Sequence, residues 1–154
     1  LAEAKRISRD NARTPMQWED SLNSGFSDHT PWLGVNPNYK EINAASQMAN
    51  DSSVFRFYQK LISLRKEHPV MAHGDLQLCC PEDGPVIAYT RSYQDETWLA
   101  VHNFSQDVQK FQYTGTGLQL DTSVLLSNYP EHDICPEDDI LTLKPYETVI
   151  FRLS

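Results

Sequence analysis

The sequence has no long hydrophobic run and few glycines, and each shortage excludes a class of protein. No stretch of the 154 residues approaches the roughly 18 consecutive apolar residues of a membrane-spanning helix. Six glycines and nine prolines are too few for a collagen-like or low-complexity chain. Hydrophobic residues make up 40% and charged residues 22%, a balance that is typical of a globular protein with a core. We therefore expect a folded chain without a membrane span.

Basic residues and cysteines are also scarce. Thirteen Lys and Arg face 21 Asp and Glu, so the net charge is −8, and neither nucleic acid nor an anionic membrane is expected as a partner. The three cysteines are odd in number and Cys79 and Cys80 are adjacent, which argues against a disulfide framework. Reduced thiols and the lack of a recognisable signal peptide predict a cytoplasmic location.

The segment from residue 6 to 37 is predicted to be a loop that packs against a larger body. Prolines and glycines interrupt any helical or strand period there. The segment nevertheless contains four large apolar side chains: Met16, Trp18, Phe26 and Trp32. A loop of this length is unusual inside a compact domain, and its aromatic residues indicate that it is anchored on another surface.

Two helices are predicted next, over residues 41–49 and 54–67. Ser53 and its two predecessors offer N-cap side chains for the second helix, and Pro69 ends it. The apolar stripe of this helix is broad, which suits a helix that lies along a sheet or the wall of a barrel.

After Gly74 the hydrophobic pattern changes from helical to strand-like. Seven short strands are predicted, over residues 76–79, 86–93, 97–104, 108–113, 123–126, 140–143 and 148–153. Close spacing and turn signals between the strands favour an antiparallel sandwich or a partly closed barrel. We expect the acidic stretch at 132–139 to be a solvated connection between strands.

The densest polar cluster runs from Arg9 to Trp18. Arginine forks and tryptophan faces are typical of sugar-binding sites, but a loop held together by an ion pair of Asp10 with Arg9 or Arg13 explains the same pattern. A second polar cluster contains metal-ligand types without the spacing of a zinc or calcium site, so no metal or cofactor is expected. Its members are His132, Asp133, Cys135, Glu137, Asp138 and Asp139.

Residues 8–18, together with the segments 23–26, 35–39 and 41–44, closely resemble the end of the catalytic barrel in one branch of the α-amylase family, glycoside hydrolase family 13. That branch contains oligo-1,6-glucosidases, dextran glucosidases, sucrose isomerases and trehalose-6-phosphate hydrolases. The resemblance implies that residues 1–70 form the last loop and helix of a β/α barrel. It implies an antiparallel β-sandwich domain over 71–154, so the chain is expected to be mainly β with helices on its N-terminal side.

Members of this family act on α-glucosides with retention, which requires a carboxylate nucleophile and a carboxylic acid. The resemblance places these residues upstream of Leu1, so no catalytic residue is assigned here and the chain alone is expected to be inactive. Arg13 matches an arginine that contacts the hydroxyls of the non-reducing glucose, whereas Arg9 and Asp10 are expected to be loop scaffolding. The implied partners are an α-gluco-oligosaccharide and the remainder of the barrel.

Two kinds of alternative to an oligo-1,6-glucosidase remain open, another enzyme of the same branch and a protein that is not an enzyme. The chain is also compatible with the tail of a trehalose-6-phosphate hydrolase or a sucrose isomerase, because substrate choice depends largely on other barrel loops. An independent carbohydrate-binding or structural β module is the third reading, since sandwiches often carry such sites. The aromatic residues of the predicted strands mostly suit core positions, which argues against that module.

Overall fold

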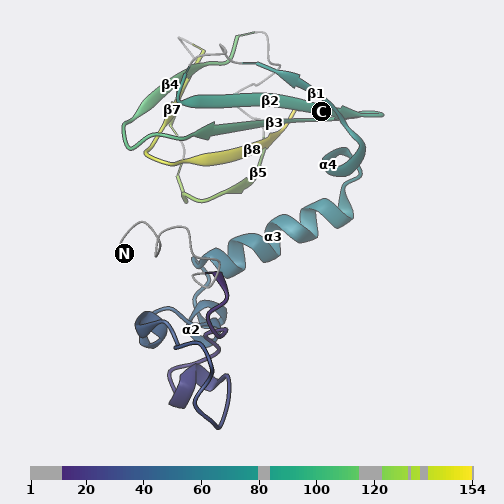
Figure 1. The fold of residues 1–154 in the computed structure, drawn as a ribbon. Helices are drawn as coiled ribbons and strands as arrows, with labels where there is room; N and C mark the ends of the chain where they lie inside the picture. The colour runs from purple at the N-terminus through teal and green to yellow at the C-terminus, as the bar shows by residue number, and fades with distance from the viewer. Residues whose placement is uncertain (1–11, 80–83, 115–122, 132, 136–138, 154) are drawn as a thin grey trace. The chain divides into compact units, whose positions relative to one another are not determined.

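The structure is a computed structural model that describes residues 12–79, 84–114, 123–131, 133–135 and 139–153 (Figure 1). The chain divides into two compact units, Leu1–Gln59 and Lys60–Ser154. The boundary between the two units falls within the helix α3, Val54–Glu67. Each unit is described by itself below.

The first unit consists of turns and short helices. Two 3₁₀ turns, η2 (Leu22–Gly25) and η3 (Pro37–Lys40), interrupt the predicted loop, and α2 (Ala44–Ala49) follows. The helix α2 begins three residues later than predicted because Asn43 caps it: its Oδ1 accepts a hydrogen bond from the Ser46 amide at 2.8 Å. The last element of this unit is the first part of α3.

The helix α3 has the bounds predicted from the sequence. Its N-cap is Ser53, whose Oγ accepts a hydrogen bond from the Arg56 amide at 3.2 Å. None of its residues is buried in this chain. Pro69 follows the helix as predicted and stands at the N-cap of a further short helix, α4 (Val70–His73), which the sequence did not predict.

The second unit contains two antiparallel sheets. The strands are β1 (Asp75–Leu78), β2 (Val86–Tyr93), β3 (Glu96–Asn103), β4 (Gln109–Gln112), β5 (Ser123–Ser127), β6 (Asp133–Cys135), β7 (Ile140–Leu143) and β8 (Thr148–Arg152). One sheet has the order β1-β2-β3-β8-β5 and the other the order β4-β7-β6. The core lies between them, with Leu99 and Phe151 from the first sheet against Phe111 and Leu141 from the second. The expected antiparallel β-sandwich is confirmed.

The prediction of a solvated connection at 132–139 is wrong for three of its residues. Asp133–Cys135 forms the edge strand β6, which pairs with β7 in the register Ile134 opposite Leu141. Three residues are too few to show the two-residue period of a strand, so this strand follows from backbone pairing with β7 rather than from its own pattern.

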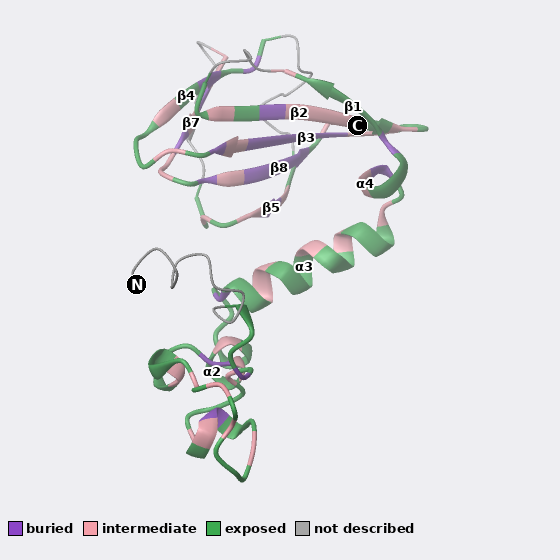
Figure 2. Ribbon diagram, viewed as in Figure 1, coloured by how far each residue is buried: buried purple, intermediate pink, exposed green. Residues whose placement is uncertain are grey.

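Buried side chains are distributed unevenly between the two units. Every large hydrophobic side chain that is buried among the described residues lies between Val70 and Phe151 (Figure 2). In the described part of the first unit the buried residues are Pro15, Ser24, Asn43 and Ser53. The described helices include none that is both long and apolar enough to cross a membrane.

Candidate functional site

The candidate sugar-contacting residue, Arg13, lies in the first unit at the start of the described chain. Its side chain is exposed, and it precedes the buried Pro15 by two residues. Arg9 and Asp10, the expected loop scaffolding, lie outside the described residues. The described hydrogen bonds that support the loop of Arg13 lie in the segment that follows it, from Met16 to Glu19.

One side of this segment is hydrogen-bonded to Ser24. The amides of Trp18 and Glu19 donate to the Ser24 carbonyl at 2.9 and 3.2 Å. The Ser24 hydroxyl donates to the Met16 carbonyl at 3.3 Å. Ser24 is fully buried, so this turn forms the inner support of the loop.

The turn that presents Ser24 has an unusual backbone. Asn23, Ser24 and Gly25 all have positive φ angles, of 52°, 56° and 68°. Side chains other than glycine rarely adopt this left-handed conformation, and two such residues in succession store strain. A side chain at Gly25 would be strained as well, because its Cβ would lie 2.7 Å from Glu19 Cγ and the Glu19 side chain would have to move. The Asn23 side chain supports the turn by donating to the carbonyls of Ser27 and His29 at 2.8 and 3.0 Å.

The other side of the segment is bonded to the N-terminus of α2. The first amides of a helix have no partner within the helix. Two of them, Ala44 N and Ala45 N, donate to the carbonyls of Gln17 and Trp18, both at 2.9 Å. The Gln17 side chain adds two bonds, because its Nε2 donates to Asn38 Oδ1 at 3.0 Å and to the Ile42 carbonyl at 2.5 Å.

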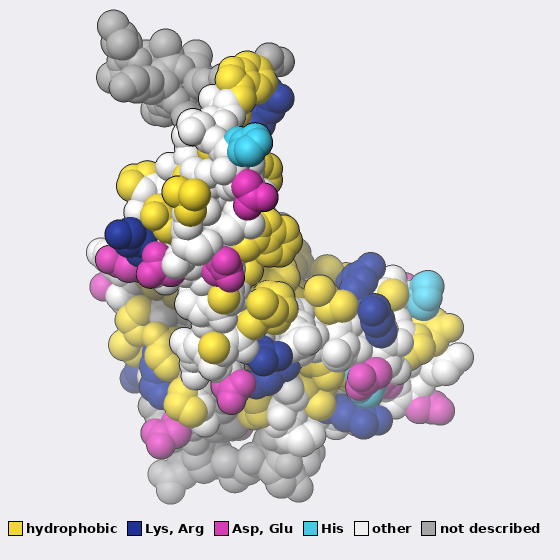
Figure 3. All heavy atoms as spheres, turned by 90° about the horizontal axis from the view of Figure 1, so that it is seen from below, with side chains coloured by type: hydrophobic (Ala, Val, Ile, Leu, Met, Phe, Trp, Pro, Cys, Tyr) yellow, Lys and Arg dark blue, Asp and Glu magenta, His cyan; other side chains and the backbone are white. Residues whose placement is uncertain are grey.

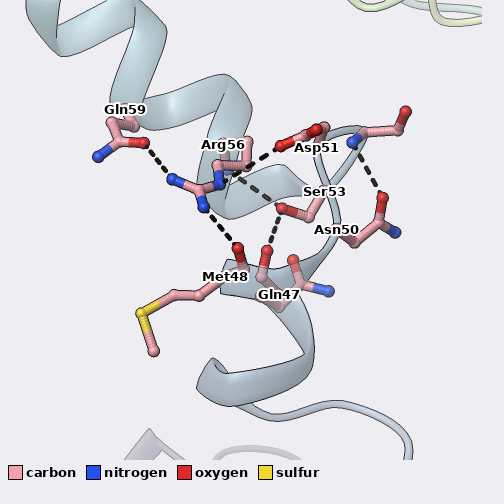
Figure 4. Close-up of polar contacts among 8 residues, drawn as sticks. Gln47, Met48, Asn50, Asp51, Ser53, Arg56 and Gln59 are labelled. Atoms are coloured by element: carbon pink, nitrogen blue, oxygen red, sulfur yellow. Dashed lines mark hydrogen bonds and ion pairs between the residues drawn. The ribbon is translucent and has the colours of Figure 1, made fainter.

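A polar junction joins α2 to α3 (Figure 4). The Arg56 guanidinium donates to the Met48 carbonyl at 2.6 Å and to Gln59 Oε1 at 2.8 Å, and its Nε lies 3.9 Å from Asp51 Oδ1. The Ser53 hydroxyl donates to the Gln47 carbonyl at 2.6 Å. These bonds satisfy carbonyls at the end of α2, so we read the junction as structural.

Large apolar side chains are exposed throughout the first unit. They are Met16, Trp18, Leu22, Phe26, Trp32, Ile42, Met48, Val54, Phe55 and Tyr58. Trp32 is the most exposed at 86%, whereas Trp18 is 52% exposed. Figure 3 shows the molecule from below, and many hydrophobic side chains, drawn in yellow, lie on that surface. The loop is rich in aromatic residues as the sequence indicates, and the described part of the first unit buries no large hydrophobic side chain against them.

The structure gives no support to a metal site in its described part. No group of three or more His, Cys, Asp or Glu side chains that could hold a metal ion occurs among the described residues. Of the acidic cluster considered from the sequence, His132, Glu137 and Asp138 lie outside the described residues. Asp139 is described, and its Oδ2 accepts a hydrogen bond from Thr114 Oγ1 at 3.2 Å.

The described histidine whose pKa is shifted, His102, lies in the sandwich unit. Burial lowers the pKa of His102 below its ordinary value of 6.5 because the charged ring loses hydration. The ring lies 5.6 Å from that of Tyr89 and 6.1 Å from that of Phe104, and its Nδ1 is 3.2 Å from Thr148 Oγ1. These are the contacts of a packed sheet residue rather than of a catalytic group.

The sequence analysis assigned no role of their own to Gln17 and Ser24, which support the Arg13 loop. Gln17 acts through hydrogen bonds to residues distant in the chain, and Ser24 through a left-handed backbone conformation. Neither feature produces a periodic pattern in the sequence. Asn43 is different, because an N-cap asparagine three residues before a serine is a recognisable start of a helix. That pattern could have moved the start of α2 to its observed position.

Comparison with known proteins gives two family matches. Residues 1–74 match the family model described as "Alpha amylase, catalytic domain". Residues 86–150 match "Alpha-amylase SusG C-terminal domain".

Individual relatives agree with these matches. The oligo-1,6-glucosidase of Halalkalibacterium halodurans is 43% identical over 93% of this chain and 25% of its own length. The trehalose-6-phosphate hydrolase of Escherichia coli is 37% identical over 92% of this chain and 25% of its own length. The crystal structure of the trehalulose synthase MutB from Pseudomonas mesoacidophila superposes with a TM-score of 0.81 at 40% identity, over 94% of this chain and 26% of that chain.

The chain therefore spans about a quarter of the length of the relatives it matches. Structures of MutB variants have been determined with sucrose and with glucose, so that relative binds sugars as a longer protein. The two family matches follow one another along this chain, a catalytic-domain segment first and a C-terminal domain second. The chain belongs to the α-amylase family, glycoside hydrolase family 13, and corresponds to the C-terminal portion of its enzymes.

Proposed function

We propose that this chain is the C-terminal part of an α-glucosidase that hydrolyses α-1,6-linked gluco-oligosaccharides with retention of configuration. The observation that carries the proposal is the 43% identity to an oligo-1,6-glucosidase over 143 residues, which include the Arg13 segment. Retaining hydrolysis needs two carboxyl groups about 5 to 5.5 Å apart. We assign neither to this chain, so we expect the 154 residues alone to be inactive.

We further propose that residues 1–70 complete the catalytic barrel and that residues 71–154 form the domain that follows it. The change of family match between residues 74 and 86 supports this boundary. The exposed apolar side chains of the first unit support it as well, because a loop and a helix at the rim of a barrel would pack such side chains against the remaining barrel. The remainder of the barrel is then the main partner of this chain.

Within this enzyme, Arg13 is proposed to contact the hydroxyls of the non-reducing glucose. A guanidinium presents several N–H donors in one plane, so it can hold two hydroxyl or carboxylate oxygens at once. Its exposure at the end of a hydrogen-bonded loop supports this role. The free thiol of Cys79 is consistent with our proposal of a cytoplasmic enzyme.

The test is the substitution Arg13→Ala in the full-length enzyme, assayed with isomaltose. Loss of a charge-assisted contact to bound substrate should lower kcat/KM by about tenfold or more. Arg65→Ala is the matched control, because Arg65 is an exposed arginine on α3. Wild-type kinetics in Arg13→Ala would contradict a contact of Arg13 with the substrate. The 154-residue chain alone serves as the inactive reference in the same assay.

A trehalose-6-phosphate hydrolase is the second candidate. The 37% identity to the Escherichia coli enzyme of that name supports it, less strongly than the 43% identity supports the first candidate. Turnover of isomaltose and of trehalose 6-phosphate by the full-length enzyme distinguishes the two. A kcat/KM at least tenfold higher for the phosphorylated sugar would overturn the oligo-1,6-glucosidase proposal, and conversion of sucrose into an isomer would indicate a sucrose isomerase instead.

A further inference from the structure

We propose that Gln17 is a positioning residue for Arg13, and that its side-chain amide sets the distance of the Arg13 loop from the turn before α2. This inference rests on the proposed contact of Arg13 with substrate. In this proposal Gln17 acts on the substrate through Arg13 rather than through a contact of its own.

The geometry of Gln17 is that of a cross-link between distant segments. Its Nε2 has two hydrogens, and one amide group donates both to acceptors 21 and 25 residues away, Asn38 Oδ1 and the Ile42 carbonyl. The Asn38 and Ile42 segments are themselves joined, because the Ile42 amide donates to the Asn38 carbonyl at 2.9 Å. The side chain therefore binds the Arg13 segment to a turn with its own hydrogen bond.

The path from Gln17 to Arg13 is short and stiff. Three residues lie between them, and the chain advances at most about 3.6 Å per residue. Pro15 lies between them, is buried and has a restricted φ angle. In this proposal a displacement at Gln17 is passed along this short segment to Arg13.

The loop has enough other support to remain folded without this amide. The backbone of Gln17 and Trp18 stays bonded to α2, and that of Trp18 and Glu19 stays bonded to Ser24. Removing the Gln17 amide therefore leaves the segment folded, and in this proposal it shifts the segment only slightly. Small displacements matter in such a site, since a 1 Å error in position can cost on the order of 100-fold in rate.

Two variants of the full-length enzyme, Gln17→Ala and Gln17→Glu, test the proposal. Gln17→Glu keeps the size and shape of the side chain but replaces its NH₂ group with a carboxylate oxygen. That oxygen would face two acceptors, Asn38 Oδ1 and the Ile42 carbonyl, so this variant separates the loss of the hydrogen bonds from a loss of bulk. We expect both to lower kcat/KM for isomaltose about tenfold, with the split between kcat and KM that Arg13→Ala shows. Gln47→Ala in α2 is the matched control, because the described contacts include no hydrogen bond from its side chain.

The deciding measurement is a double-mutant cycle with Arg13. If Gln17 acts through Arg13, adding Gln17→Ala to Arg13→Ala should change kcat/KM by less than twofold. An equal loss in both backgrounds, or wild-type kinetics in Gln17→Ala beside an impaired Arg13→Ala, would overturn the positioning role alone. Wild-type kinetics in Arg13→Ala would overturn the substrate contact of Arg13 and this inference together.

Discussion

At the scale of single residues, the carboxylate of Glu96 joins the end of α3 to the sandwich within the second unit. Its Oε1 accepts a hydrogen bond from the Trp98 indole at 2.9 Å and lies 3.0 Å from His68 Nδ1. Arg152 Nε lies 3.6 Å from the same oxygen. The Trp98 ring is 3% exposed, so its N–H depends on this acceptor.

We expect Glu96→Ala to lower the free energy of unfolding by about 1–3 kcal/mol, the usual cost of leaving a buried donor unpaired. Glu96→Gln retains an acceptor oxygen and should lose less. Urea unfolding of the chain, followed by far-UV circular dichroism, measures both. Asp95→Ala at the neighbouring exposed turn position is the control, and a loss as large in this variant would contradict a specific role for Glu96.

At the scale of elements, the junction between α2 and α3 depends on one buried hydroxyl. Ser53 Oγ accepts from the Arg56 amide and donates to the Gln47 carbonyl, so it serves the start of one helix and the end of the other (Figure 4). The helices are short, at 6 and 14 residues, and gain little stability on their own.

Ser53→Ala should lower stability by about 0.5–2 kcal/mol, the usual cost of losing an N-cap. The loss should be local, with faster amide hydrogen exchange in the first turn of α3. Ser52→Ala is the matched control. The exposed Ser52 contributes its backbone amide, which donates to Asn50 Oδ1 at 2.9 Å, and the substitution keeps that amide. Equal exchange in the two variants would show that Ser53 does not hold the junction.

The elements also show what the sequence could predict. The bounds of α3, β2 and β7 agree with the prediction because caps, turn residues and a clear period mark them. The strand β6 and the helix α4 were missed because each is too short to show a period. Of the candidate site, Arg13 came from a family motif, whereas Gln17 and Ser24 required the tertiary hydrogen bonds that only the folded chain displays.

At the scale of the whole molecule, the two units differ in how they are stabilised. The second unit buries large side chains between two sheets, and this burial is worth about 1.5–3 kcal/mol for each. The described part of the first unit buries no large hydrophobic side chain and is held mainly by polar contacts such as those of Gln17, Ser24 and Asn43. Polar contacts of this kind contribute about 1 kcal/mol each. The fold of the first unit is therefore expected to depend on a larger body.

Hydrogen exchange on the chain and on the full-length enzyme tests this dependence. In the chain alone, amides at 12–59 should exchange well before those of the sandwich strands, since few buried apolar contacts oppose local opening. In the full-length enzyme, the same amides should gain protection, because the proposed barrel would cover Trp18, Phe26 and Trp32. The core strands β3 and β8 are the internal control and should change little between the two samples. Equal protection of 12–59 in both samples would mean that this unit is stable without the barrel, and that its exposed aromatic residues serve another contact.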